Sequence, residues 1–417
     1  MNASIRKNPL TKNKSLNRLT LPGIVVAAMF ACGPFMFATI GGRGLFLYLA
    51  ILFALSILLQ AFAFDKRHAL SLTVNKEVNI IITPFLICLL WQLISFFWSP
   101  ALSFASIYAY LKTMLFFLLL SLPRYSKADK KLMLVAQTAI IILATVVLLT
   151  QKETSSAGGA VTERLTFTFF GVEQDPNYLA FFYVGPFVTL LSVASDKCRH
   201  ILARLGSITL LAFLTFGILS TGSRGALLGI VVATVIFLAT KTTLRWWKFL
   251  SIIIGSALLA VVLFKSISQF LPESIADRFT LDHILESGGS GRTEIWERYI
   301  TNLIKNPLYL LVGAGNSSCV SINYADAHNY FLESWFDFGI IGVAISIFFY
   351  FVFFRSVIKA KNHLSFTIII GALVMAMFLS VNRMLPFWLC LTLANILHLP
   401  NKEELPRAKK KQASPLD

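Results

Sequence analysis

Long hydrophobic runs separated by short polar segments make up most of the chain. Each run holds roughly 16 to 24 residues, and an α-helix of that length can cross the hydrocarbon core of a membrane. The pattern therefore predicts an all-α polytopic membrane protein with about 12 transmembrane helices. The predicted helices cover residues 21–40, 44–64, 78–98, 105–122, 132–150, 177–194, 203–220, 225–240, 249–264, 329–353, 364–380 and 384–398.

One polar interval is much longer than the others and divides the chain. It is expected to form a loop on one face of the membrane and to carry short helices of its own. The predicted division is transmembrane helices 1–9 with short loops (1–264), the long loop (265–328), transmembrane helices 10–12 (329–398) and a tail (399–417).

Local signals predict two helix ends in the polar segments. Apolar residues recur at helical spacing from Ile295 to Ile304, and this loop helix is expected to end before Asn306-Pro307. Asp175 precedes Pro176, so Asp175 is expected to cap the start of the sixth transmembrane helix.

Basic residues gather on one side of the predicted helices. Of the 37 Lys and Arg residues, 26 fall in the N-terminus, the C-terminal tail and the short loops on their side. An excess of Lys and Arg marks the cytoplasmic face, so both termini are expected in the cytoplasm and the long loop outside it. The net charge of +17 is thus sorted by membrane side rather than gathered into a patch, and nucleic acid is not an expected partner. The short cytoplasmic loops lack a Walker A motif, which argues against chemistry driven by ATP.

Three arginines on the predicted outer face are candidates for binding an anionic ligand. Arg224 lies in Ser220-Thr-Gly-Ser-Arg-Gly between two helices joined by almost no loop, and Arg292 follows a Gly/Ser run and begins the loop helix. A guanidinium matches phosphate oxygens with two parallel hydrogen bonds, and the first turn of a helix offers N–H groups to an anion. Arg164 is the third candidate. Each also has a simpler interpretation: an arginine reaching out of a turn to the membrane surface, or a solvated charge in a linker or loop.

His328 stands where the long loop meets the tenth transmembrane helix. An imidazole takes up a proton near neutral pH, so His328 is the candidate general base, and a histidine that caps the helix is the alternative. Glu333 and Asp337 lie one and about two helical turns beyond His328. Each is a candidate base or a residue that orients His328, and a structural carboxylate is the alternative. Asp326 and His328 are two residues apart and do not share a helix face, so a metal site is not expected.

Lys112 is a charged residue within a predicted transmembrane helix, 105–122. A charge in the hydrocarbon core is costly, so Lys112 is expected to face the interior of the bundle. It would serve there as a functional charge; the alternative is a lysine that is paired or that reaches out to the membrane surface.

Several of these segments resemble those of O-antigen ligases and O-antigen polymerases, a superfamily of bacterial membrane glycosyltransferases. The most specific is His328-Asn329, nine residues, Gly339, two residues and Gly342. It looks like the ligases' pattern of His, Asn/Ser/Gln, nine residues, Gly, two residues and Gly/Thr/Tyr. Ser223-Arg-Gly, Asp175-Pro-Asn and Gly291-Arg-Thr-Glu-Ile-Trp resemble other segments of the superfamily. The resemblance covers most of the chain from Arg164 onward, and residues 1–150 match only as hydrophobic spans.

The resemblance implies a glycan donor carried on undecaprenyl pyrophosphate at the outer face of the bacterial inner membrane. Ligases transfer the glycan to lipid A-core and polymerases transfer it to another lipid-linked unit; the histidine–glycine pattern favours a ligase. No cofactor and no metal are expected, because pyrophosphate is already a good leaving group, and membrane lipids are further expected partners. Taken with the residues above, the expected catalytic residues are His328, Arg224 and Arg292, and the expected substrate-binding residues are Arg164, Asn329, Glu333 and Lys112.

A polytopic transporter or flippase is the alternative from another class of protein. The predicted helices carry few charges, no paired halves are visible, and the polar residues gather on one face. Transporters place their sites near the midplane between repeats, so the pattern favours the enzyme.

Overall fold

The computed structural model describes residues 19–36, 38–40, 43–63, 76–151, 153–155, 162–169, 172–241, 255, 269, 271–280, 282 and 288–400. Helices make up nearly all of the regular structure in these ranges. The strands described form three short antiparallel pairs: β1 (Thr39–Ile40) with β2 (Arg43–Gly44), β3 (Glu153–Ser155) with β4 (Thr162–Thr166), and β5 (Thr168–Phe169) with β6 (Val172–Glu173).

Seven helical segments among the described residues are long and apolar enough to cross a membrane. They are α3 (Lys76–Ile94) continued by η3 (Ser95–Trp98), α4 (Phe104–Ser121), α5 (Lys127–Gln151), α6 (Pro176–Phe181) followed by α7 (Val184–Ala194), α8 (Ile201–Ser220), α9 (Arg224–Lys241) and α16 (Tyr330–Lys359). Four shorter apolar helices join them: α1 (Leu21–Ala31), α2 (Leu45–Ala63), α17 (His363–Ala376) and α18 (Leu385–His398). The predicted all-α polytopic membrane fold is confirmed.

Every predicted transmembrane segment except one coincides with these helices. The exception, 249–264, lies outside the described residues apart from Gly255. The first predicted segment is shorter than expected because α1 ends at Ala31, and Pro34 then lies in a turn of 3₁₀ helix, η2 (Gly33–Phe35). The tenth is longer than expected and continues to Lys359.

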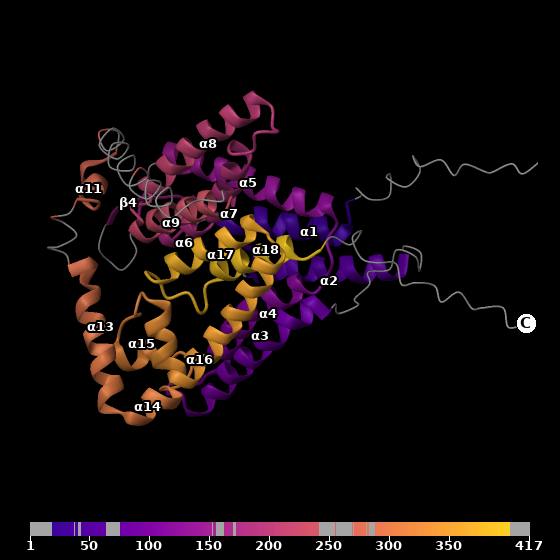
Figure 1. The fold of residues 1–417 in the computed structure, drawn as a ribbon. Helices are drawn as coiled ribbons and strands as arrows, with labels where there is room; N and C mark the ends of the chain where they lie inside the picture. The colour runs from indigo at the N-terminus through magenta and orange to yellow at the C-terminus, as the bar shows by residue number, and fades with distance from the viewer. Residues whose placement is uncertain are drawn as a thin grey trace, which may run out of the picture.

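The central helix of the bundle is α17, which packs against α9, α18 and α7 (Figure 1). Its residues Ile368, Ile369 and Met375 are fully buried. A cluster of aromatic rings ties four other helices together, since Phe117 of α4 lies 4.7 Å from Phe85 of α3 between ring centroids, and 5.9 and 5.7 Å from Phe349 and Trp388. This packing gives the bundle a fixed frame.

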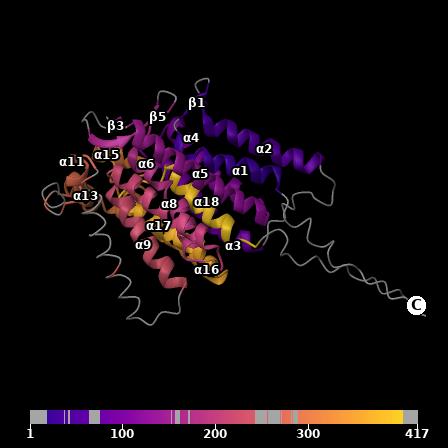
Figure 2. The same ribbon diagram turned by 90° about the horizontal axis from the view of Figure 1, so that it is seen from above.

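Short elements gather at one end of the bundle. The β3–β4 hairpin, α11 (Glu273–Asp277), α13 (Gly288–Lys305) and α15 (Ser318–Asn323) lie on the same side in Figure 1 and again in Figure 2. The predicted loop helix is confirmed: α13 ends at Lys305, and α14 (Pro307–Val312) follows after Asn306. Tyr299 and Leu303 of α13 are buried against α15 and the start of α16, in a second core.

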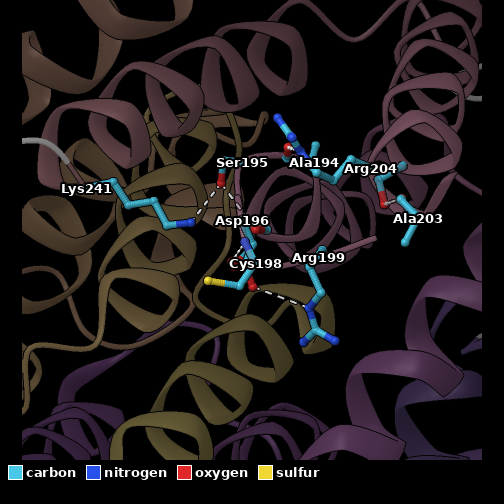
Figure 3. Close-up of polar contacts among 10 residues, drawn as sticks. Ala194, Ser195, Asp196, Cys198, Arg199, Ala203, Arg204 and Lys241 are labelled. Atoms are coloured by element: carbon cyan, nitrogen blue, oxygen red, sulfur yellow. Dashed lines mark hydrogen bonds and ion pairs between the residues drawn. The ribbon is translucent and has the colours of Figure 1, made fainter. Parts of the chain in front are cut away.

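The opposite end of α7, α8 and α9 is closed by polar contacts (Figure 3). Lys241 Nζ donates a hydrogen bond of 2.8 Å to Ser195 Oγ, and Arg204 Nε donates one of 3.1 Å to the carbonyl oxygen of Ala194. These contacts lie about 30 Å, the length of α8, from the end that carries the short elements.

Candidate functional site

The turn between α8 and α9 lies between two arginines and leads directly into a third. Gly222, two residues before Arg224, has a φ of +61°, which glycine adopts without strain. A Cβ atom at this position would lie 3.3 Å from both Arg164 Cγ and Arg278 Nε. The turn is therefore packed between Arg164 of β4 and Arg278, which follows α11.

Arg164 uses its guanidinium to bind two parts of the chain. Its Nε donates to the carbonyl oxygen of Thr221 at 2.9 Å, and Nη2 donates to Asn177 Oδ1 at 2.7 Å. The cap predicted at Asp175 is confirmed, because its carboxylate accepts two backbone N–H groups at the start of α6. Burial, followed by the positive charge of Arg278, lowers the pKa of Arg164 to about 10.

Arg292 reaches the same region from α13. Its guanidinium carbon lies 5.9 Å from the ring centroid of Phe378, and a Cβ atom on Gly225 would lie 2.8 Å from Phe378 Cβ. One phenyl ring therefore contacts Arg292 and the residue that follows Arg224. Burial lowers the pKa of Arg292, and the positive charges of Arg224 and Arg278 lower it further.

His328 occupies a constrained position at the end of the loop. Its backbone has a φ of +48°, and its N–H donates to Ser380 Oγ at 3.1 Å. Burial, and then the positive charge of Arg292, lowers the pKa of His328 below its ordinary value of 6.5, while Asp326 and Asp175 act in the opposite direction. This shift favours the neutral imidazole, which is the form that can accept a proton.

These residues form one group, which we call the arginine cluster: Arg164, Arg224, Arg278 and Arg292, with His328 beside Arg292. The connection between α17 and α18 links its two halves, because Phe378 contacts Arg292 and Ser380 binds His328. The structure thus brings together Arg224, Arg292 and His328, of which the first and the last lie 104 residues apart along the chain (328 − 224). Such a group can hold a multiply charged anion next to a base.

Asn329 and Glu333 lie beside the arginine cluster but are engaged within the protein. Asn329 Oδ1 accepts the backbone N–H groups of Phe331 and Leu332 and so caps α16. Glu333 is buried; its Oε1 accepts a hydrogen bond of 3.8 Å from Cys319 Sγ, and its Oε2 has no hydrogen-bond partner. Neither contact reaches the imidazole of His328.

Asp337 is not an orienter of His328. Its carboxylate accepts the backbone N–H groups of Ser317 and Cys319 and the hydroxyl of Ser318, all at 2.9–3.0 Å. The side chain therefore fixes the start of α15. The carboxylates that act on the charge of His328 are Asp326 and Asp175 instead.

The tertiary structure assembles one group of metal-ligand type that the sequence did not indicate. Within the described ranges, Cys319, Asp326 and Glu333 offer ligand atoms that lie within 4.8 Å of one another. Arg383 is near the same groups: burial works against its charged form, but Glu333 and then Cys319 raise the pKa of Arg383. An arginine therefore already supplies positive charge to these residues.

Lys112 lies on the outside of the bundle, and the prediction that it faces the interior is wrong. Tyr110, Thr113 and Met114 take the inward positions of α4 and are buried, whereas Lys112 is exposed. Its Nζ lies 5.9 Å from the ring centroid of Tyr108, a cation–π contact one turn away. The structure does not bring Lys112 to the arginine cluster.

Sequence reasoning missed Arg278, Phe378, Ser380 and Arg383, which belong to no recognised segment. A signal for the two arginines was present, because only 10 of the 37 basic residues fall in the predicted outer segments. Basic residues are uncommon on the outer face of membrane proteins, so each one found there is a candidate for a specific role. The contacts of Phe378 and Ser380 depend on the tertiary structure alone.

Comparison with known proteins bears on this site. A family model described as "O-Antigen ligase" matches residues 209–347, which include Arg224, Arg292 and His328. No curated protein matches the chain. The match covers residues 209–347 alone, and together with the multi-pass membrane architecture it supports a relationship to the O-antigen ligase superfamily of glycosyltransferase-like membrane enzymes.

Proposed function

We propose that this protein transfers a glycan from undecaprenyl pyrophosphate to an acceptor at the outer face of the bacterial inner membrane. The acceptor we favour is lipid A-core, which makes the protein an O-antigen ligase. The observation that carries the proposal is the convergence of Arg224, Arg292 and a neutral His328 on one site. The match to the O-antigen ligase family supports the same reaction class.

The arginines have the chemistry that a pyrophosphate requires. A lipid-linked pyrophosphate carries several negative charges, and guanidinium groups bind phosphate oxygens in pairs. The repulsion within the arginine cluster falls when such an anion enters. Arg224 and Arg292 then stabilise the negative charge that develops on the pyrophosphate as the sugar departs.

His328 supplies the base. The hydroxyl oxygen of the acceptor forms a bond to the anomeric carbon of the sugar, while the bond from that carbon to the pyrophosphate oxygen breaks. The electron pair of that bond leaves with undecaprenyl pyrophosphate, and the hydroxyl proton passes to the neutral imidazole of His328. Attack opposite to the leaving group inverts the anomeric carbon.

The proposal includes a location, a domain division and independence from metal. The positive-inside pattern orients the arginine cluster outward and both termini inward. The division that we propose is transmembrane helices 1–9 (1–264), an outer loop (265–328), transmembrane helices 10–12 (329–398) and a tail (399–417). Arginines take the place that a metal ion has in many phosphoryl sites, so we expect full activity in EDTA.

Transfer by the purified protein tests the proposal. The protein in liposomes receives a defined glycan on undecaprenyl pyrophosphate, together with either lipid A-core or a second lipid-linked unit. Product on lipid A-core supports the ligase, and elongation of the lipid-linked unit identifies a polymerase instead. Movement of the lipid across the membrane without transfer contradicts the proposal and favours a flippase.

A further inference from the structure

Arg278 has a donor without a partner beside the turn that leads into Arg224. It follows α11, and its Nε lies 3.3 Å from the position that a Cβ atom on Gly222 would occupy. This Nε is buried and has no hydrogen-bond partner. A buried donor without an acceptor is costly, so the position suits a ligand that brings its own acceptor.

Arg164, on the other side of Gly222, already uses its donors within the protein. Two of its nitrogens already donate to Thr221 and Asn177. A ligand that recruited Arg164 would have to break these bonds and leave their oxygens unpaired. Arg164 is therefore suited to hold the turn in place, and Arg278 is suited to bind.

Charge places Arg278 in one group with Arg224 and Arg292. Burial lowers the pKa of Arg278, and the nearby charge of Arg224 lowers it further. Arg292 lies within electrostatic range of both. Arg224, Arg278 and Arg292 together can match the charge of a diphosphate ester.

We propose that Arg278 is the third residue that binds the pyrophosphate, in the role that the sequence assigned to Arg164. The assignment rests on the proposed function, because it places one more donor on the same ligand. Arg164 becomes a positioning residue, which holds the α8–α9 turn against the start of α6.

Binding of farnesyl pyrophosphate, a soluble isoprenyl pyrophosphate, tests the assignment. The wild-type protein in nanodiscs is compared with Arg278→Ala, Arg278→Lys, Arg164→Ala and Arg224→Ala. Arg355→Ala is the matched control, because Arg355 is an exposed arginine near the far end of α16. The dissociation constant and the thermal midpoint are measured for every variant.

We expect Arg278→Ala to weaken binding about 10- to 100-fold, as for the loss of a charge-assisted hydrogen bond, with an unchanged thermal midpoint. Arg278→Lys keeps the charge but loses the Nε donor, and it should also bind more weakly than wild type. Arg164→Ala should lower the thermal midpoint, because Thr221 and Asn177 lose their donor, and Arg355→Ala should change neither quantity.

Two results separate failure of this assignment from failure of the proposed function. If Arg224→Ala weakens binding while both Arg278 variants bind as wild type does, Arg278 does not contact the pyrophosphate, and the proposed function stands. If neither Arg224→Ala nor the Arg278 variants weaken binding, the arginine cluster does not bind pyrophosphate, and both proposals fail.

Discussion

At the scale of single residues, the environment of His328 prepares it to act as a base. The histidine needs no carboxylate in direct contact, because burial and the charge of Arg292 already favour its neutral form. Its backbone is in the left-handed conformation, and its N–H donates a hydrogen bond to Ser380. These two features fix the position of the backbone from which the imidazole side chain extends. Arg292, which we propose binds the donor, therefore also favours the deprotonated form of the base.

The pH dependence of transfer follows from this environment. We expect kcat/KM to be flat around pH 7 to 8 and to fall on acidification, with a midpoint below 6.5, because protonation of His328 removes the base. His328→Ala should lower kcat by about 100- to 10,000-fold and abolish this acidic decline. An acidic decline that persists in the residual activity of His328→Ala contradicts the assignment, as does full activity of that variant.

Arg224 tests whether the shape of a guanidinium matters in addition to its charge. Arg224→Lys keeps the charge but cannot form two parallel hydrogen bonds, so we expect kcat/KM to fall on the order of 100-fold. Steady-state transfer assays measure the loss, with Arg355→Lys as the control. Wild-type turnover by Arg224→Lys would argue against bidentate binding of the phosphate.

At the scale of elements, Gly339, the first glycine after His328, serves to dock the loop. Gly339 has a φ of +65° within α16, and a Cβ atom there would lie 2.2 Å from the carbonyl oxygen of Leu311. Just before this kink, the carbonyl oxygens of Phe336 and Asp337 accept the N–H groups of Ala314 and Gly315. The backbone of the loop thus pairs with the backbone of α16, which places His328 at one end of a rigid unit.

The kink predicts a structural effect at a position remote from the chemistry. Gly339→Ala combines a strained backbone with a steric clash, so we expect it to destabilise the protein by about 3 kcal/mol and lower the thermal midpoint. Gly206→Ala is the matched control, because Gly206 lies in α8 with no atom within 4 Å of an added Cβ. Equal midpoints for the two variants would mean that α16 is not bent at Gly339.

At the scale of the whole molecule, the frame separates two ends that differ in chemistry. The arginine cluster lies at one end of α8, and the exposed Cys198 lies beyond its other end. The other cysteines are buried or half-buried, so Cys198 is a natural marker of its face. In the orientation that we propose from the charge pattern, that face is cytoplasmic.

This orientation predicts the outcome of labelling with a membrane-impermeant maleimide. In intact spheroplasts we expect no reaction at Cys198, and reaction only after permeabilisation. A cysteine introduced at Glu297, which is exposed on α13, should react without permeabilisation. The reverse pattern would place the arginine cluster in the cytoplasm and exclude a donor bound at the outer face.

Much of this protein could be predicted from its sequence, for reasons that are local. Hydrophobic length gives the spans, Asp175 before Pro176 gives a cap, and Asn306-Pro307 ends α13. Lys112 shows the limit, because hydropathy says that a residue lies within a span but not which way it faces. Asp337 shows another limit, since its partners Ser317 and Cys319 are brought to it by folding.

By itself, the sequence determined the helical membrane architecture, the charge asymmetry and the identity of His328, Arg224 and Arg292 as candidates. The architecture and the charge asymmetry follow from the free energy of transferring each segment into the hydrocarbon core, and the candidates follow from the chemistry of their side chains. Residues that become neighbours in space hardly alter either property. The tertiary structure alone decided which arginines converge, that Arg164 is bonded to the protein while Arg278 Nε has no partner, and that burial and Arg292 lower the pKa of His328. Each of these depends on distances and burial between distant segments, and those quantities exist only once the chain has folded.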